Sequence, residues 1–471
     1  MATSPANSEL KEQLRARFVT KTLNEVPTPS VVLDLAKLHV NCERMLEATE
    51  RLDLLWRAHI KSHKTTELTR LQVGDDRNTP VSLIVSTILE AENILPLLRE
   101  YQSKGRRVNV LFSFPVFVSA VPRLAALASH LGPQSLSLMI DHPSQLSCAA
   151  AIASSPSSHP PLVFIKIDAG YGRAGVVPSS PACETLIDEV LAEEAKGNCV
   201  LQGLYAHAGH SYGTREDWGA MEYLAGEFAG LAGVARLVRQ KSPNHPLVLS
   251  VGATPTTTTI QYPGLFAGGG RGPRDGVAGA LEKLVAELRG EEFELEVHAG
   301  VYTTLDMQQL ATHARDSSLM TADDIAISVV AEVASIYPGR GVNGTTEALI
   351  NAGSLALGRE PVADKGEMPG KDYTGWGFLM PWHLNTPAPG QDFPRVHDGW
   401  QVGRISQEHG ILTWQGRKED EVPLRVGQRV RVWPNHSCIA GACFDWYLIV
   451  DSRIKGKEDE IVDVWPRCRG W

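Results

Sequence analysis

The sequence has little cysteine, no long hydrophobic run and no excess of positive charge. Its seven cysteines are an odd number spread over 471 residues, which excludes a disulfide framework as the basis of the fold. No stretch approaches the roughly 18 uninterrupted apolar residues that a membrane-spanning helix needs. A net charge of −9 argues against nucleic acid as a main partner. These absences favour an enzyme that works neither in a membrane nor on nucleic acid.

The first 21 residues lack the apolar core of a signal peptide. They also contain Glu9 and Glu12, which a transit peptide would avoid. A hydrophobic content of 43% and a charged content of 21% are ordinary for a globular protein. We therefore expect a cytoplasmic enzyme.

Strand-like and helix-like segments alternate through the first two thirds of the chain. Eight strand-like segments, most of them followed by an amphipathic helical segment, are typical of a (β/α)8 barrel. A doubly wound sheet would fit several of these units but not the full count. We predict an α/β fold with a TIM barrel at residues 36–320. The candidate strands are residues 54–61, 81–86, 109–114, 136–141, 163–168, 201–207, 247–251 and 293–298.

The remaining sequence has short strands separated by glycine and proline. This composition predicts a β-rich domain at residues 321–471. Residues 1–35 form an N-terminal segment, of which we expect residues 27–35 to add a strand to that domain. The glycine-rich residues 268–272 lack the strand-to-helix context and the lysine of a phosphate-binding loop, so we interpret them as a surface loop.

Residues 57–64 (RAHIKSHK) are the most informative stretch of the chain. On a strand, Arg57, His59, Lys61 and His63 would share one face. Burying so many cationic groups is unfavourable unless an anion lies beside them. Cationic neighbours also disfavour the ammonium form of Lys61, which frees its amine to attack a carbonyl. The pattern indicates a Schiff-base lysine beside a phosphate-bearing cofactor, and the alternative is a solvated basic edge strand.

Polar residues and glycines follow the ends of several other candidate strands. The active site of a barrel forms where its strands end, so these residues are candidates for ligand binding. The alternative, that they are ordinary turn residues, explains the glycines but not the charged and aromatic side chains beside them. The candidates are Asp168, Arg173, Tyr205, His207, Tyr212, Thr254, His298, Gly300 and Val301.

His436 and Cys438 form a second candidate site. Two residues apart on a strand, their side chains would point the same way, and imidazole with thiolate suits zinc. Two protein ligands leave positions open for water or substrate, as a catalytic zinc requires. The alternative is a buried cysteine beside an unrelated histidine. We interpret Cys443 as a small core residue and not as a third ligand.

Segments that span nearly the whole chain, in the expected order, resemble one family of enzymes. The family is that of the fold-type III pyridoxal 5'-phosphate (PLP) enzymes, comprising eukaryotic-type D-serine dehydratases and D-threonine aldolases. The resemblance implies an alanine-racemase-like barrel followed by a β-rich domain. The matching segments are residues 57–64, 166–175, 204–213, 251–256, 351–354, 406–410 and 434–438.

The resemblance also implies roles for individual residues. Lys61 would be the catalytic residue that carries the cofactor, and His436 and Cys438 would bind Zn²⁺. Members of the family are commonly homodimers with each β domain facing the partner's barrel, so two arrangements are open: His436 and Cys438 serve the Lys61 of their own subunit, or that of the other. The implied cofactor-binding residues, to which we add Arg173 for its fixed charge, are Lys61, Arg173, Tyr205, Tyr212, Thr254, Gly300 and Val301.

The metal pair divides the activities of the family. A histidine with a cysteine is typical of the dehydratases, whereas the aldolases typically present a histidine with an aspartate. Cys438 therefore favours a D-serine dehydratase that forms pyruvate and ammonia. The alternatives are D-threonine-aldolase-type cleavage to glycine and an aldehyde, a racemase, and a non-catalytic PLP-binding protein. Departures from the family pattern are Ala58, Gly172, Val301 and an insertion at about residues 257–290.

Overall fold

The computed structural model describes residues 5–267, 272–316, 318–362, 375–382 and 399–471. The chain divides into two compact units. A barrel unit contains Arg44–Gly300 and Gly470–Trp471, and a β unit contains Pro5–Glu43 and Val301–Arg469. Within the described ranges, no helix is both long enough and apolar enough to cross a bilayer.

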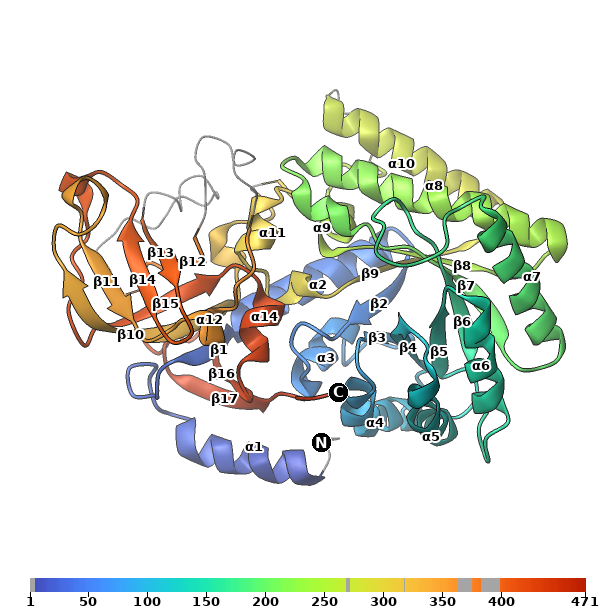
Figure 1. Cartoon of the computed structure of the whole chain (residues 1–471), viewed down its shortest axis with the longest axis horizontal. Coiled ribbons are helices and arrows are strands. Elements are labelled where there is room, and N and C mark those ends of the chain that lie inside the picture. The colour runs from blue at the N-terminus through green and yellow to red at the C-terminus, as the bar shows by residue number, and fades with distance from the viewer. Residues whose placement is uncertain (1–4, 268–271, 317, 363–374, 383–398) are drawn as a thin grey trace. The chain divides into compact units, whose positions relative to one another are not determined.

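The barrel unit is a closed ring of eight parallel strands, β2 to β9, joined in chain order with β9 pairing back onto β2 (Figure 1). The predicted TIM barrel is therefore confirmed. Its strands are β2 (Leu55–His59), β3 (Val81–Val85), β4 (Val108–Pro115), β5 (Leu136–Ile140), β6 (Leu162–Lys166), β7 (Val200–Tyr205), β8 (Val248–Val251) and β9 (Glu294–Ala299).

Helices connect successive strands of the barrel. They are α3 (Thr66–Val73), α4 (Ile88–Ser103), α5 (Val121–Leu131), α6 (Leu146–Ala153), α7 (Pro181–Ala195), α8 (Asp217–Lys241), α9 (Thr254–Thr258) and α10 (Pro273–Gly290). Every residue of β5, β6 and β8 is buried, because these strands are covered on both faces. The expected insertion at 257–290 contains α10, which packs along α8 (Figure 1). Of the expected glycine-rich loop, residues 268–271 lie outside the described residues.

The β unit is built on a nine-stranded sheet of order β11-β14-β13-β12-β15-β10-β1-β16-β17. The strand expected within residues 27–35 is β1 (Ser30–Asp34), which pairs antiparallel with β10 and parallel with β16. The other strands are β10 (Ile327–Tyr337), β11 (Glu347–Ile350), β12 (Gly377–Leu379), β13 (Trp400–Ile405), β14 (Gly410–Trp414), β15 (Arg429–Pro434), β16 (Trp446–Val450) and β17 (Ile461–Pro466). The helices of this unit include α1 (Pro5–Phe18), the start of α2 (Leu35–Arg51), α11 (Met307–Ala311), α12 (Ser354–Leu357) and α14 (Ser437–Ala442).

The borders of the units differ from the expected domain borders at residues 35 and 320. Residues 301–320 belong to the β unit because hydrogen bonds tie them to residues before and within α14. The backbone N–H of Gln308 donates to the carbonyl of Asn435, and that of Ser437 donates to Asp306 Oδ2. These contacts join residues far apart in the chain, so the local sequence pattern did not reveal them.

Candidate active site

Lys61 lies just beyond the end of β2, in the turn that leads to α3. The strand ends at His59, and the backbone N–H groups of His63 and Lys64 both donate to the carbonyl of Ile60. The expectation that Arg57, His59, Lys61 and His63 share one strand face is therefore wrong, because the strand is too short. Its end still places Lys61 where a barrel enzyme carries its active site.

The other cations of residues 57–64 have partners within the protein. Arg57 is 1% exposed and donates to Glu296 Oε1 at 2.7 Å. The ring of His63 bonds to Thr65 and Gln72, and Lys64 pairs with Glu90. The anion that Arg57 needs is therefore a carboxylate, not a phosphate. The edge-strand alternative is also wrong, because β2 pairs on both sides.

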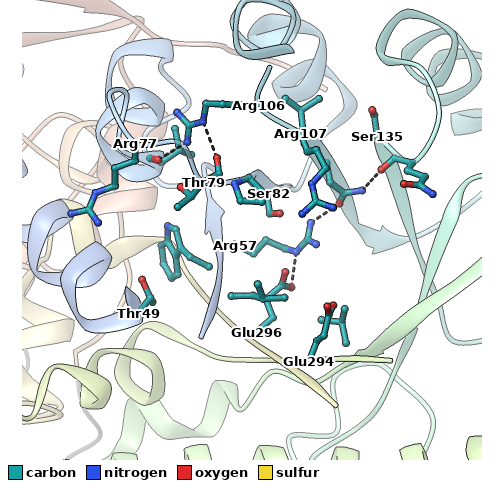
Figure 2. Close-up of a pocket in the computed structure, with 18 of the residues that line it drawn as sticks. Thr49, Arg57, Arg77, Thr79, Ser82, Arg106, Arg107, Ser135, Glu294 and Glu296 are labelled. Carbon is teal, nitrogen blue, oxygen red and sulfur yellow. Dashed lines mark hydrogen bonds and ion pairs between the residues drawn. The ribbon is translucent and has the colours of Figure 1, made fainter. Parts of the chain in front are cut away.

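A cavity of about 680 Å³ lies at the opposite end of the barrel, where the strands begin (Figure 2). Figure 2 shows Arg57 beside Glu296, and Arg57 Nη1 also donates to Asn109 Oδ1 at 2.7 Å. Arg106 donates to the carbonyls of Thr79, Gly74 and Val73. Because both buried arginines have partners, a carboxylate and an amide oxygen for Arg57 and backbone carbonyls for Arg106, we interpret this end of the barrel as structural.

Breaking the buried pair should destabilise the barrel strongly. We expect Arg57→Met to lower the free energy of unfolding by about 3–5 kcal/mol, because it leaves the Glu296 carboxylate buried without its partner. Urea unfolding measures the effect. The control is Glu50→Ala, which breaks the ion pair between Glu50 and Arg77. Because the Glu50 side chain is 74% exposed, this change should alter the free energy of unfolding by less than about 1 kcal/mol. Equal effects in the two variants would contradict this interpretation.

Three histidines lie at the rim of the barrel near Lys61; His59 and His298 are buried and His207 is partly buried. Burial lowers the pKa values of His59, His207 and His298 well below the ordinary range, and nearby cationic groups lower them further. For His59 and His207 the largest of these charges is Lys61. The imidazoles are therefore neutral and can accept or donate hydrogen bonds without adding charge. In the sequence, His207 and His298 were candidates for ligand binding and His59 was part of the cationic stretch, but their neutral state was not predicted.

Tyr205 and Lys166 complete the interior of the rim. The Tyr205 ring stacks on His298 with centroids 4.2 Å apart, and Lys166 Nζ lies 4.7 Å from the centre of the Tyr205 ring. Burial, followed by the charge of Arg173, lowers the pKa of Lys166 to about 8. Sequence reasoning missed Lys166, although a lysine inside a barrel strand is itself a signal of an unusual environment.

The remaining predicted cofactor residues follow the ends of four strands, β6, β7, β8 and β9. Arg173 is exposed in the loop after β6, and Tyr212 lies in the short helix after β7. Thr254 is buried at the start of α9, which contacts the helix of Tyr212. Gly300 follows β9, where a Cβ atom would lie 3.0 Å from the His59 carbonyl oxygen. Val301 is buried and opens the β unit.

The residues at the rim fit a PLP molecule in their chemistry. The amine of Lys61 suits the aldehyde, and hydroxyls such as that of Thr254 suit a phosphate. His298 donates or accepts through Nδ1 to Ser250, whereas its buried Nε2 has no partner among the described residues. A buried nitrogen left unpaired is unfavourable, and a polar ligand in the barrel mouth would relieve it.

His436 and Cys438 lie together in the β unit, but not on a strand. Strand β15 ends at Pro434, His436 directly precedes α14, and Cys438 lies in the first turn of that helix. The expectation of strand geometry is wrong, because the chain turns into a helix at His436. The two side chains nevertheless interact. Burial opposes the charged imidazole, but Cys438 and Asp306 raise the pKa of His436 well above its ordinary value.

Asp306 is the residue of this site that sequence reasoning missed. Its carboxylate is fully buried, lies 3.4 Å from His436 Nδ1 and accepts hydrogen bonds from the backbone of Ser437 and Gln309. The sequence shows an aspartate at the position that caps the N-terminus of α11. Its contact with His436 joins residues 130 positions apart, so no local pattern predicts it. No group of three or more His, Cys, Asp and Glu in the described part of the chain could hold a metal. The Asp306 carboxylate is placed to orient the His436 imidazole through Nδ1, as carboxylates do for metal-binding histidines in general.

If His436 and Cys438 bind Zn²⁺, removing the Asp306 carboxylate should weaken that binding without abolishing it. We expect Asp306→Asn to lower the affinity for Zn²⁺ about 10–100-fold, because the imidazole loses the partner that fixes its orientation. Competition with a chromophoric chelator measures this affinity. The control is Asp324→Asn. Asp324 is another carboxylate of the β unit that caps the start of a short helix, so its loss should leave the Zn²⁺ affinity unchanged. Wild-type affinity in Asp306→Asn would contradict the assignment.

Cys443 is not the core residue that we expected. It is exposed at the end of α14, whereas Cys42, Cys148, Cys183, Cys199 and Cys468 are buried. All seven cysteines lie in the described part of the chain and none forms a disulfide.

Two known families match the two parts of the chain. The alanine racemase N-terminal domain matches residues 33–266, and a serine dehydratase domain matches residues 326–450. Among solved structures, the D-threo-3-hydroxyaspartate dehydratase from Delftia sp. HT23 superposes with a TM-score of 0.70 at 24% identity, covering 96% of this chain and 100% of that one. Another structure of that dehydratase is a cysteine-to-alanine variant in a metal-free form. These likenesses confirm the alanine-racemase-like fold.

Curated relatives match the chain over almost its whole length. The D-serine dehydratase of Saccharomyces cerevisiae is 29% identical, covering 96% of this chain and 97% of the relative. The D-serine dehydratase of Schizosaccharomyces pombe is 37% identical, covering 98% of this chain and 96% of the relative. The resemblance seen in the sequence is thereby confirmed, and the chain belongs to the D-serine dehydratase family.

Proposed function

We propose that the protein is a PLP-dependent lyase that converts D-serine to pyruvate and ammonia. The observation that carries this proposal is Lys61 at the barrel rim beside neutral histidines, in a chain that is 37% identical to a D-serine dehydratase over 98% of its length. The enzyme would remove the α-proton and then the β-hydroxyl of the substrate.

Several rim residues would hold PLP. Lys61 would bind it covalently, and Thr254, Tyr212 and the backbone at Gly300 and Val301 would hold its phosphate. Tyr205 and Arg173 would lie beside the ring. When bound, PLP withdraws electrons from the α-carbon of an amino acid and so makes its proton more acidic.

The amine of Lys61 would act as the base that removes the α-proton. The neutral rings of His59, His207 and His298 can hydrogen-bond to polar groups beside it without adding positive charge. The low pKa of Lys166 also lets the rim give or take a proton near neutral pH.

His436 and Cys438 would bind a zinc ion with Asp306 orienting the histidine. When bound, zinc acts as a Lewis acid for a hydroxide leaving group, which is otherwise a poor one. The chemistry of the donors supports zinc, because thiolate and imidazole are its common ligands. The metal-free form of the related D-threo-3-hydroxyaspartate dehydratase variant supports a metal in this family.

A panel of amino acids tests the substrate class. We expect ammonia release from D-serine, little or none from L-serine or D-alanine, and loss of the activity with a chelator. D-alanine is the informative control because it has an α-proton but no β-hydroxyl. Release from L-serine in preference to D-serine would overturn the proposal.

We infer in addition that the protein is a cytoplasmic homodimer. Seven cysteines without a disulfide suit a reducing compartment. Light scattering of the purified protein should give twice the mass of one chain, and a monomeric mass would contradict the dimer.

A further inference from the structure

Glu227, on the inner face of α8, is a buried carboxylate that the proposed reaction does not use. Its residue is 1% exposed, and its carboxylate accepts three hydrogen bonds. The backbone N–H of Ala208 donates to Oε1 at 2.7 Å and that of Gly252 at 3.2 Å. The hydroxyl of Thr256 donates to Oε2 at 3.0 Å. The donors come from the loop after β7 and from the loop and helix after β8, so one side chain joins two neighbouring rim loops.

The peptide group of Gly252 connects Glu227 to His207. Its N–H donates to Glu227, and its carbonyl lies 2.7 Å from His207 Nδ1. A carbonyl can only accept, so Nδ1 must carry the proton. Because His207 is neutral, its Nε2 then presents a lone pair.

Gly252 is closely packed in this arrangement. Its φ is +147°, and a Cβ atom would lie 2.2 Å from the His298 carbonyl oxygen and 2.4 Å from Thr257 Oγ1. The β8 loop therefore lies against β9, and a movement of the Gly252 peptide would disturb His207 as well as the loop that carries Thr254.

We propose that Glu227 is a positioning residue that locks the β7 and β8 rim loops together and thereby fixes the tautomer of His207. This inference rests on the proposed function, because it assigns the locked loops to the cofactor site. The function of Glu227 is to order that site before the cofactor binds. Burial raises the pKa of Glu227 to about 7, which is consistent with a role that depends on hydrogen bonds more than on charge.

The chain offers a matched control for this residue. Glu194, on α7, also accepts a backbone N–H of β7, that of Leu201 at 2.9 Å, but at the start of the strand. It also bonds to a histidine, His245 Nε2, at 2.9 Å. Glu194→Ala thus removes a similar contact from the opposite end of the same strand.

Hydrogen exchange and nitrogen NMR of the histidine rings, both measured on cofactor-free protein, test the inference. In Glu227→Ala we expect amides of residues 206–213 and 252–258 to exchange about tenfold faster or more, because the shared acceptor of two buried N–H groups is lost. The His207 ring, assigned with His207→Gln, should change from one tautomer to a mixture. PLP affinity, from the visible absorbance of the holoenzyme, should fall about tenfold. Glu194→Ala should leave all three readouts unchanged.

Glu227→Gln separates positioning from charge. Its amide oxygen can accept both backbone N–H groups, and the Thr256 hydroxyl can rotate to accept from its amide nitrogen. We therefore expect Glu227→Gln to restore exchange, tautomer and PLP affinity to near wild-type values. Should Glu227→Ala fail to fold, Glu227→Asp takes its place, because an aspartate is one methylene too short to reach both loops.

Wild-type exchange and an unchanged His207 tautomer in Glu227→Ala or Glu227→Asp would overturn the inference. These readouts need neither cofactor nor substrate, so they are independent of the proposed function. If wild-type protein formed no pyruvate from D-serine, the proposed function would fail while the exchange data still decided the role of Glu227.

Discussion

Lys61→Ala should lower the rate of pyruvate formation from D-serine at least about a thousandfold, because it removes both the covalent attachment of the cofactor and the base. The purified variant should also lack the visible absorbance of lysine-linked cofactor. The effect should be this large because Lys61 is partly exposed beyond β2, whereas Lys166 is buried within β6 and would not take its place. Steady-state kinetics and an absorbance spectrum measure the two effects.

Lys61→Arg is the matched control, because it keeps the positive charge but offers no amine that can attack a carbonyl. We expect it to be as inactive as Lys61→Ala. The lysine charge lowers the pKa values of His59 and His207, and an arginine keeps that influence. Substantial activity in Lys61→Arg, or an unchanged spectrum in Lys61→Ala, would show that Lys61 does not carry the cofactor.

Cys438→Ala should lower the rate of D-serine dehydration by about a thousandfold or more, while leaving the absorbance spectrum of the bound cofactor unchanged. The loss reflects several kcal/mol of stabilisation that a metal gives to a departing hydroxide. Metal analysis of the variant should find less than one zinc per chain. Stripping zinc from wild-type protein with a chelator should give the same phenotype, and restoring zinc should recover only the wild type.

Cys443→Ala is the control for this variant. Cys443 lies in the same region, five residues on, but is exposed at the end of α14 and has no role in the proposed site. It should keep full activity and full zinc content. If full activity survived verified removal of zinc, or if Cys443→Ala lost zinc and Cys438→Ala did not, the metal assignment would be wrong.

The sequence predicted the barrel well because its signals are local. Apolar strands such as β5 and β6 alternate with amphipathic helices such as α5, and each is read from its own residues. The same holds for β15, whose strand pattern is also carried by its own residues. By contrast, the border near residue 300 depends on the contact of Asp306 with Ser437, which no local pattern reveals.

The candidate site was predicted in part, for the same reason. Lys61, His436 and Cys438 stand out by residue type and spacing, and Cys438 lies near His436 as expected. The reasons given for them were less accurate, since β2 ends before Lys61 and a helix begins after His436. Groups that act through long-range packing, such as Glu227 and Asp306, have no sequence signal beyond an ordinary acidic residue.

Product analysis with D-serine tests the central claim most directly. Purified holoenzyme should consume D-serine and form pyruvate and ammonia in equal amounts. Proton NMR measures D-serine and pyruvate, and an ammonia assay measures the ammonia. This result would establish that the bond to the β-hydroxyl is broken. Glycine with formaldehyde would instead show cleavage between the α- and β-carbons, L-serine would show racemisation, and either product in place of pyruvate would contradict the account.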